Sequence, residues 1–217
     1  MAVTGLRRMA AAAVAFGALA VLASSADHGW LAGADRRAFE AVRGRRGPGT
    51  IRGARMISAL AELAVVYPVL ALTGVGAARR GAWWRAAAPC LVVAGGTAAR
   101  RCLSRMIARQ RPPAEAWLAE PEGFSLPSKH TTLAVLTAGA AMRAFGVRGA
   151  PAQAATALTA AGIGASRICL GVHWPADVVA GWLFAEGWLR LAGPVLAQAK
   201  PERTSIVSRD GRRRAVR

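Results

Sequence analysis

The sequence predicts an all-α fold, a polytopic membrane bundle of six transmembrane helices. Hydrophobic residues make up 54% of the 217-residue chain, and its mean hydropathy is +0.31. Six apolar stretches each approach the roughly 20 residues that a helix needs to cross the hydrocarbon layer. Several of them are apolar on all sides, and a chain of this length cannot build a soluble core large enough to bury such helices.

The six expected spans follow one another along the chain, separated by loop-forming segments. They cover residues 9–25, 57–78, 86–104, 130–147, 152–171 and 175–197. The first follows Arg7 and Arg8 and ends in Ala-Ser-Ser-Ala, a pattern also typical of a signal peptide. We expect an uncleaved anchor, because five more spans follow it.

The segments between and after the spans divide the chain further. Residues 35–42 fit a short helix lying in the membrane interface. We expect one membrane domain over residues 1–199, with its core at 57–197. The tail at 200–217 is basic and lacks apolar periodicity, so we expect it to be a disordered cytoplasmic tail.

The net charge is +18, from 29 Lys and Arg against 11 Asp and Glu, and its distribution indicates which partners the chain can bind and how it is oriented in the membrane. Most arginines fall between the apolar stretches, which is typical of a membrane protein that faces anionic headgroups. No basic patch is interleaved with aromatic residues, so we expect no nucleic-acid partner. The charges of the short loops predict that both termini lie on the cytoplasmic side of the membrane and that the loop 105–129 and the turn 171–175 lie outside. The connection 27–56, with seven arginines, departs from this rule.

The three cysteines, Cys90, Cys102 and Cys169, lie in or beside apolar segments without CxxC spacing. They indicate neither a disulfide framework nor a zinc site.

Three polar clusters share the outer side in this topology. They are Arg109-Gln110-Arg111-Pro112, Pro127-Ser128-Lys129-His130 and the segment 166–177. Phosphate-ester cleavage without a metal needs cations and N–H donors around the phosphoryl oxygens. Arg111 and Arg167 supply planar guanidinium groups that fit phosphate, and Lys129 adds a further charge. Ser128 is expected to cap a helix whose first N–H groups, at Lys129 and His130, form an anion site.

A nucleophile and an acid complete the expected chemistry. His173 precedes Asp177 by four residues, a spacing that lets the carboxylate fix the imidazole tautomer. We expect His173 to attack phosphorus and His130 to protonate the leaving group, with no cofactor and no metal. Metal binding by His130, His173 and Asp177 is the alternative, but the arginines around them argue against a cation.

These clusters resemble the three motifs of the type 2 phosphatidic acid phosphatase superfamily, which includes bacterial membrane lipid phosphatases and is related to vanadium haloperoxidases. The family pattern is Lys-x6-Arg-Pro, Pro-Ser-x-His and Ser-Arg-x5-His-x3-Asp. The third motif matches at Ser166, Arg167, His173 and Asp177, the second at Pro127, Ser128 and His130, and the first at Arg111 and Pro112. The resemblance covers residues 105–185. It implies a six-helix lipid phosphatase that forms a phosphohistidine.

The first motif departs from the family pattern, because Ser104 stands where the resemblance places a lysine. Arg105 is adjacent and Arg101 lies one turn earlier, so we expect one of them to substitute. The missing lysine keeps a non-catalytic, lipid-binding or lipid-moving relative open as a rival function, and a phosphotransferase is a second rival.

The expected substrate is a lipid phosphate, since a pocket at headgroup depth favours an amphiphile. Polyprenyl diphosphate is the first candidate. Phosphatidic acid, phosphatidylglycerophosphate and a polyprenyl-phosphate sugar phosphate stay open, because the motifs bind only the phosphate that all of these share. Glu186 is expected to pair with Arg190 on one helix face, and Glu62 is either a wet rim residue or part of the site mouth.

Overall fold

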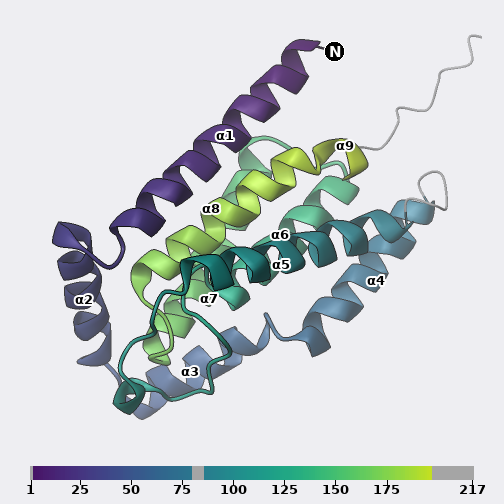
Figure 1. Cartoon of the computed structure of the whole chain (residues 1–217). Helices are drawn as coiled ribbons and strands as arrows, with labels where there is room; N and C mark the ends of the chain where they lie inside the picture. Colours follow the sequence, from purple (N-terminus) through teal and green to yellow (C-terminus); the bar gives the residue numbers. More distant parts are fainter. Residues whose placement is uncertain (1, 80–85, 197–217) are drawn as a thin grey trace, which may run out of the picture.

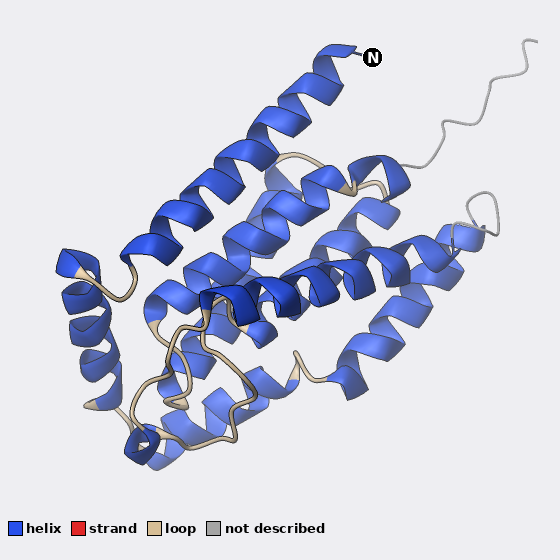
Figure 2. Ribbon diagram, viewed as in Figure 1, coloured by secondary structure: helices blue, strands red, loops and turns tan. Residues whose placement is uncertain are grey.

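The computed structural model describes residues 2–79 and 86–196, and all regular structure in this part of the chain is helical (Figures 1 and 2). The helices are α1 (Ala2–Ser25), α2 (Gly29–Arg43), α3 (Pro48–Ala59), α4 (Leu63–Arg79), α5 (Ala88–Ile107), η2 (Ala114–Ala116), α6 (Lys129–Ala144), α7 (Ala150–Cys169), α8 (Pro175–Leu191) and α9 (Gly193–Leu196). The predicted all-α class is therefore confirmed. The predicted disordered tail at 200–217 lies outside the described residues, and the domain boundaries stay a prediction.

Proline and glycine set the helix limits as elementary stereochemistry requires. Helices α5, α7 and α8 carry proline in the first turn, where its missing N–H costs no hydrogen bond. Helix α7 begins after Gly149, whose φ of 70° favours glycine. Helix α5 ends at Ala108, which adopts a left-handed conformation and donates its N–H to the carbonyl of Ser104.

Helix α6 lies at the centre of the bundle and packs against α4, α5, α7 and α8. Leu133, Leu136, Ala185 and Leu189 form part of the main hydrophobic core between these helices. Helix α1 runs along α8, and α3 packs on α7 (Figure 1). A Cβ at Gly164 would stand 2.0 Å from a methyl of α8, so this glycine permits the close approach of α7 and α8.

One end of the bundle gathers the segments that carry the polar motifs. Helix α2, helix α3, the α5–α6 connection and the α7–α8 turn meet there (Figure 1). The predicted short helix at 35–42 is part of the longer α2, which buries Asp35 and Phe39 against the bundle. Its place in a membrane interface stays a prediction.

The predicted count of six spans is not confirmed. Of the described helices, only Thr4–Ser25 is both long enough and apolar enough to cross a membrane alone. The pair α3 and α4, bent by 41°, also qualifies if it is counted as one segment. Helices α4, α6 and α8 have 16 or 17 residues, and α5 carries three arginines in its last two turns. A helix or helix pair does lie at each predicted stretch.

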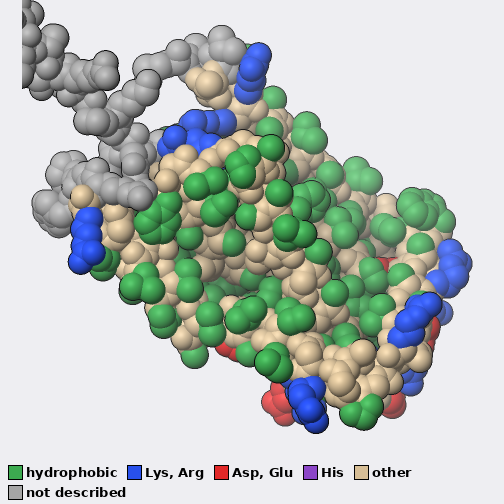
Figure 3. Space-filling view, turned by 180° about the vertical axis from the view of Figure 1, so that it is seen from behind, with side chains coloured by type: hydrophobic (Ala, Val, Ile, Leu, Met, Phe, Trp, Pro, Cys, Tyr) green, Lys and Arg blue, Asp and Glu red, His purple; other side chains and the backbone are tan. Residues whose placement is uncertain are grey.

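One face of the molecule shows where apolar side chains are exposed. Hydrophobic side chains cover the middle of this face, and Lys and Arg lie towards two opposite ends (Figure 3). The exposed large hydrophobic residues of α3, α4, α5 and α7 include Ile57, Leu63, Tyr67, Leu72, Leu91 and Leu158. An apolar band between charged ends is the pattern that a lipid-facing surface requires.

Candidate active site

The α7–α8 turn positions the histidine and aspartate of the third motif. Gly171 has a φ of 80°, and a Cβ there would stand 2.0 Å from the carbonyl oxygen of Ala116, so the turn requires glycine. Four residues beyond it, Pro175 starts α8. The turn buries both His173 and Asp177 almost completely, at 1% and 0% exposure. The turn therefore holds the imidazole and the carboxylate in fixed positions away from bulk water.

Asp177 fixes the tautomer of His173. The carboxylate accepts hydrogen bonds from the Trp174 N–H (2.8 Å), the Ser125 hydroxyl and Arg109 (2.7 Å). His173 Nδ1 lies 3.3 Å from its Oδ2, which confirms the predicted proximity of the pair. Because an ionised carboxylate only accepts, Nδ1 carries the proton and Nε2 presents a lone pair. That lone pair faces the Arg111 guanidinium, 3.3 Å away.

The protonation of His173 follows from its environment. Burial lowers the pKa of His173 to about 4, and this effect outweighs the opposing effect of the Asp177 carboxylate. The nearby guanidinium groups of Arg111 and Arg167 lower it further. The imidazole is therefore neutral at physiological pH, the state in which a histidine can act as a nucleophile.

Arg109 anchors the Asp177 carboxylate, and the sequence did not indicate this role. Its guanidinium is 3% exposed and pairs with Asp27 (3.0 Å), Asp35 (2.7 Å) and Asp177 (2.7 Å). Burial lowers the pKa of Arg109, but the carboxylates overcome this effect and raise it, so it stays charged. Asp35 also accepts the N–H of Ala176, in the first turn of α8, at 2.8 Å. Helix α2 thus holds both Arg109 and the start of α8.

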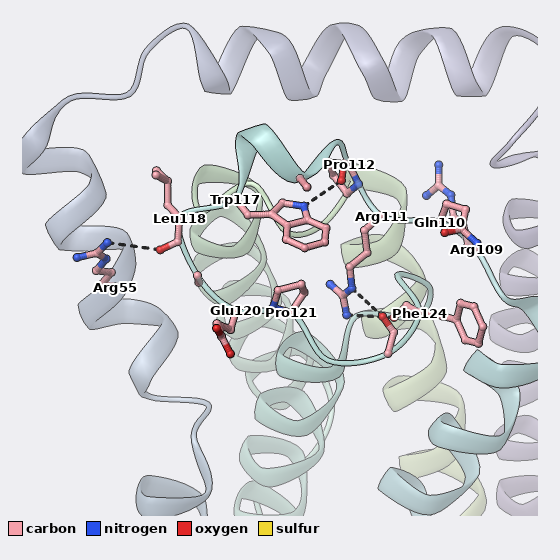
Figure 4. Close-up of a pocket in the computed structure, with 13 residues that line it drawn as sticks. Arg55, Arg109, Gln110, Arg111, Pro112, Trp117, Leu118, Glu120, Pro121 and Phe124 are labelled. Carbon is pink, nitrogen blue, oxygen red and sulfur yellow. Dashed lines mark hydrogen bonds between the residues drawn. The ribbon is translucent and has the colours of Figure 1, made fainter.

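Arg111 is held by backbone carbonyls instead of carboxylates. It donates to the carbonyl oxygens of Val172 (2.6 Å), Glu122 (2.7 Å), Gly123 (2.9 Å) and Phe124 (3.1 Å). Figure 4 shows the guanidinium pointing into the curve of this loop, towards Phe124. These neutral partners orient the group, and burial lowers the pKa of Arg111 although Asp177 and Glu122 attract its charge through space.

Arg167 reaches the same region from α7. It is 4% exposed, and its Nη1 donates to the Ser58 hydroxyl at 2.8 Å. Its Nε is buried without a hydrogen-bond partner among the described residues. Arg167 interacts electrostatically with both Arg111 and His173, so two predicted phosphate-binding arginines meet beside the histidine.

The second motif lies at the start of α6, as predicted. Ser128 occupies the N-cap position, but it forms no side-chain capping hydrogen bond, because its hydroxyl accepts from Thr131 at 3.1 Å. Lys129 pairs with Glu122 at 2.6 Å, which lowers the pKa of that carboxyl. In this structure the Lys129 charge is therefore directed to Glu122.

His130 is close to the same cations and has an acidic partner. Its Nε2 lies 3.0 Å from Glu62, so of the two alternatives for Glu62 the structure supports a place at the mouth of the site. His130 interacts electrostatically with Arg167, which in turn interacts with His173. The described residues contain no group of three His, Cys, Asp or Glu side chains that could hold a metal ion.

The first motif differs from what the sequence suggested in one respect. Ser104 is 4% exposed and faces the bundle, whereas Arg101 and Arg105 are exposed. Arg101 lies one turn before Ser104 but is exposed, so its side chain does not follow Ser104 into the bundle. The residue four positions before Ser104 is Arg100, which is buried.

A cavity of about 1150 Å³ opens beside the cluster (Figure 4). Its polar and aromatic lining residues include Arg55, Arg109, Gln110, Arg111, Trp117, Glu120 and Phe124. Such a mixture of polar groups and aromatic rings can accommodate a polar head group, and the cavity reaches the cluster through Arg109 and Arg111.

Comparison with known proteins agrees with this geometry. The family model described as the PAP2 superfamily matches residues 82–197. The chain is 34% identical over 146 residues to the decaprenylphosphoryl-5-phosphoribose phosphatase of Mycolicibacterium smegmatis, a match that covers 65% of this chain and 75% of that protein. It is 35% identical over 138 residues to its namesake from Mycobacterium tuberculosis, covering 62% of this chain and 73% of the relative.

A solved structure shows the same fold. It is the crystal structure of a transmembrane PAP2 type phosphatidylglycerolphosphate phosphatase from Bacillus subtilis, with a TM-score of 0.75 and 23% identity. The match covers 84% of this chain and 94% of that one. The chain therefore belongs to the PAP2 superfamily and is a phosphatase of that group.

Proposed function

We propose that the chain is an integral membrane lipid phosphatase that works through a phosphohistidine on His173. The observation that carries the proposal is the orientation of this residue. Asp177 holds the Nδ1 proton, and the Nε2 lone pair faces the cation of Arg111. A phosphoryl group bound by Arg111 would therefore stand in front of the nucleophilic atom.

The reaction takes two displacements. In the first, the Nε2 lone pair of His173 forms the bond to phosphorus, the bond to the lipid oxygen breaks, and His130 gives its proton to that oxygen. In the second, water attacks phosphorus and gives a proton to His130. The electrons of the N–P bond then return to His173, and inorganic phosphate leaves. Asp177 stabilises the positive charge on His173 throughout, while Arg111 and Arg167 offset the charge on the phosphoryl oxygens.

His130 is placed to exchange this proton with the help of Glu62. The carboxylate lies 3.0 Å from His130 Nε2 and is itself exposed, so it can pass protons between the imidazole and water. Ser128 and the first N–H groups of α6 contribute to the same anion site, because those amides have no partner within the helix.

Among the candidate lipids, we favour a polyprenyl-phosphate sugar phosphate over polyprenyl diphosphate. Two relatives are named for decaprenylphosphoryl-5-phosphoribose. The cavity lined by Arg111 also offers charged groups at Arg55 and Glu120 and an aromatic ring at Trp117, a set that suits a sugar. The lipid chain would extend over the apolar surface of the bundle.

We further propose that both termini are cytoplasmic and that the site faces the outside of a bacterial inner membrane. The turn 171–175 and the α5–α6 connection lie at one end of the bundle (Figure 1). The opposite end carries Arg8, Arg143, Arg148 and Arg190 around a small pocket, in line with a cytoplasmic surface.

The test is phosphate release by the purified protein from four lipids in matched micelles: prenylphosphoryl-5-phosphoribose, undecaprenyl diphosphate, phosphatidic acid and phosphatidylglycerophosphate. We expect release with chelator present, fastest from the first lipid, and none from His173→Ala. Acid-quenched protein should carry a phosphoryl group that is stable to base and labile to acid, as a phosphohistidine is. Release from His173→Ala at the wild-type rate would refute the mechanism.

The same assay separates the rival functions. A lipid-binding relative would bind the four lipids without releasing phosphate. A phosphotransferase would release less phosphate than the lipid it consumes when an acceptor alcohol is added.

A further inference from the structure

Three arginines converge on the site without a hydrogen-bonded carboxylate: Arg100 and Arg167 are buried and Arg111 is partly buried. Within the described residues they donate only to neutral acceptors: the Pro127 carbonyl for Arg100, four loop carbonyls and the His173 imidazole for Arg111, and the Ser58 hydroxyl for Arg167. Arg111 interacts electrostatically with each of the other two. Three like charges held together in a buried place are costly unless an anion joins them.

The acidic groups nearby form their hydrogen bonds with other side chains. Asp177 pairs with Arg109 and His173, Glu122 with Lys129 and Glu62 with His130. These carboxylates attract the three arginines through space but form no hydrogen bond with them, so the arginines can still bind an anionic ligand. A phosphoryl group, with two negative charges and several acceptor oxygens, is an anion of the right chemistry.

Arg100 contributes the observation that points most directly to a ligand. It is 7% exposed, and its Nη1 donates to the carbonyl of Pro127 at 3.0 Å. Its Nε is buried and has no hydrogen-bond partner in the described structure. A buried guanidinium nitrogen that stays unpaired costs free energy, so it indicates that a ligand supplies the missing acceptor.

The position of Arg100 on α5 explains how it reaches the site. The buried residues Val92, Gly96, Arg100 and Ser104 are spaced by four and form one stripe facing the bundle. Arg101 and Arg105 form the neighbouring stripe, which is exposed. The guanidinium of Arg100 donates to the carbonyl of Pro127, the residue directly before the Ser128 N-cap of α6. It therefore lies next to the anion site at the start of that helix.

We propose that Arg100 is a third phosphate-binding arginine, and that it supplies the cation which Ser104 lacks. From one turn before Ser104, its long side chain covers the distance that a lysine at position 104 would otherwise bridge. Arg100, Arg111 and Arg167 then hold the phosphoryl group in front of His173. The inference rests on the proposed phosphatase function.

The experiment compares Arg100→Gln with Arg101→Gln and Arg105→Gln as matched controls on the same helix. Kinetics are measured on whichever lipid the wild type hydrolyses, and orthovanadate binding is followed by tryptophan fluorescence. We expect Arg100→Gln to lower kcat/KM about 10- to 100-fold, the loss of one charge-assisted hydrogen bond, and to weaken vanadate binding by a similar factor. The two controls should stay within about twofold of wild type.

A second substitution separates binding of the phosphate from support of the loop. Adding Ser104→Lys to Arg100→Gln restores a cation at the site without restoring the hydrogen bond to Pro127. We expect it to recover about tenfold in vanadate affinity and in kcat/KM. If Arg100→Gln matches wild type in both measurements, the inference is wrong. It is also wrong if Arg100→Gln loses activity with unchanged vanadate affinity and Ser104→Lys rescues nothing, since that pattern marks a structural role.

Two further measurements keep the test decisive. Thermal unfolding in detergent shows whether Arg100→Gln folds. If it does not, Arg100→Lys replaces it, and vanadate binding within about tenfold of wild type supports the inference whereas complete loss overturns it. If the proposed phosphatase function is wrong, the wild type itself will release no phosphate. Vanadate binding would still test the role of Arg100 directly in that case.

Discussion

Removal of Arg109 tests how the catalytic carboxylate is held in place. The change Arg109→Met keeps the volume and removes the cation between Asp35 and Asp177, whose side chains are 3% and 0% exposed. Breaking a buried ion pair by removing one partner costs about 3–5 kcal/mol, because the remaining charge stays buried. We therefore expect a loss of about 3–5 kcal/mol in the free energy of unfolding.

The exposed pair of Arg43 and Glu40 supplies the matched control. These side chains are 47% and 51% exposed and lie 3.3 Å apart. Since such surface pairs contribute only about 0–1 kcal/mol, Arg43→Met should leave stability almost unchanged. Both variants are measured by equilibrium unfolding in mixed detergent micelles, alongside kcat/KM. We expect Arg109→Met to lose at least about tenfold in kcat/KM as well, because Asp177 loses a charge-assisted hydrogen bond.

A double-mutant cycle makes the reasoning refutable. Asp35→Asn removes one of the two charges that Arg109→Met leaves unpaired, so the double variant should cost less than the sum of the single ones, by about 1–3 kcal/mol. Equal stability of Arg109→Met and Arg43→Met, or strict additivity in the cycle, would show that the buried carboxylates do not depend on Arg109.

The remaining predictions concern the pH dependence, the proton partner and the turn. Because burial lowers the pKa of His173 to about 4, the acid limb of kcat/KM should fall near pH 4, and a limb near 6.5 after correction for substrate titration would contradict this. The free energy of unfolding should depend on pH for the same reason. Because folding favours neutral His173, this residue supports stability fully above pH 6.5, and the free energy of unfolding decreases as the pH falls from 6.5 towards 4. Glu62→Gln should lower kcat about tenfold in single-turnover assays while leaving vanadate affinity unchanged, since it removes only the proton partner of His130. Gly171→Ala should destabilise by more than about 2 kcal/mol in detergent unfolding, whereas Gly123→Ala, with positive φ but open space, should cost only about 1 kcal/mol.

Local pairs were predictable from the sequence, because helical geometry fixes them. The proximity of His173 and Asp177 is confirmed at 3.3 Å, and the predicted pair of Glu186 and Arg190 is confirmed at 2.5 Å. Both depend only on the spacing of four residues. The helical start at Lys129 was predictable for the same reason, from the proline and serine before it.

Long-range partners could not be predicted in this way. Arg109 contacts Asp177 across 68 residues and Asp35 across 74, and no periodicity in a single sequence links these positions. The sequence offered one indication that Asp35 is buried, because it lies four residues before Phe39 in a segment expected to be helical. Helix α2 does bury both side chains. The pairing itself depends on how α2 docks onto α8, which is a matter of tertiary packing.

The expectation that Arg101 or Arg105 substitutes for the lysine stays a prediction, and the structure adds the buried Arg100 as a further candidate. Adjacent positions on a helix differ by 100° in direction, so Arg100 and Arg101 point to different surroundings. The four-residue stripe of Val92, Gly96, Arg100 and Ser104 was present in the sequence and indicated the buried face. The count of six spans stays unconfirmed, because α4, α6 and α8 have only 16 or 17 residues and three arginines lower the hydropathy of α5.

The contacts of Asp35 in α2 with Arg109 and with the start of α8 also bear on the order in which the site forms during synthesis. The bond from the Ala176 N–H to Asp35 joins positions 141 residues apart. Chains emerge in order from the N-terminus, so Asp35 and Arg109 are present long before His173 and Asp177 are made. The nascent chain can therefore pair Arg109 with Asp35 while it still lacks a nucleophile. The pair of His173 and Asp177 is completed last, when the start of α8 is made, so a shorter nascent chain lacks the side chains on which the proposed chemistry depends.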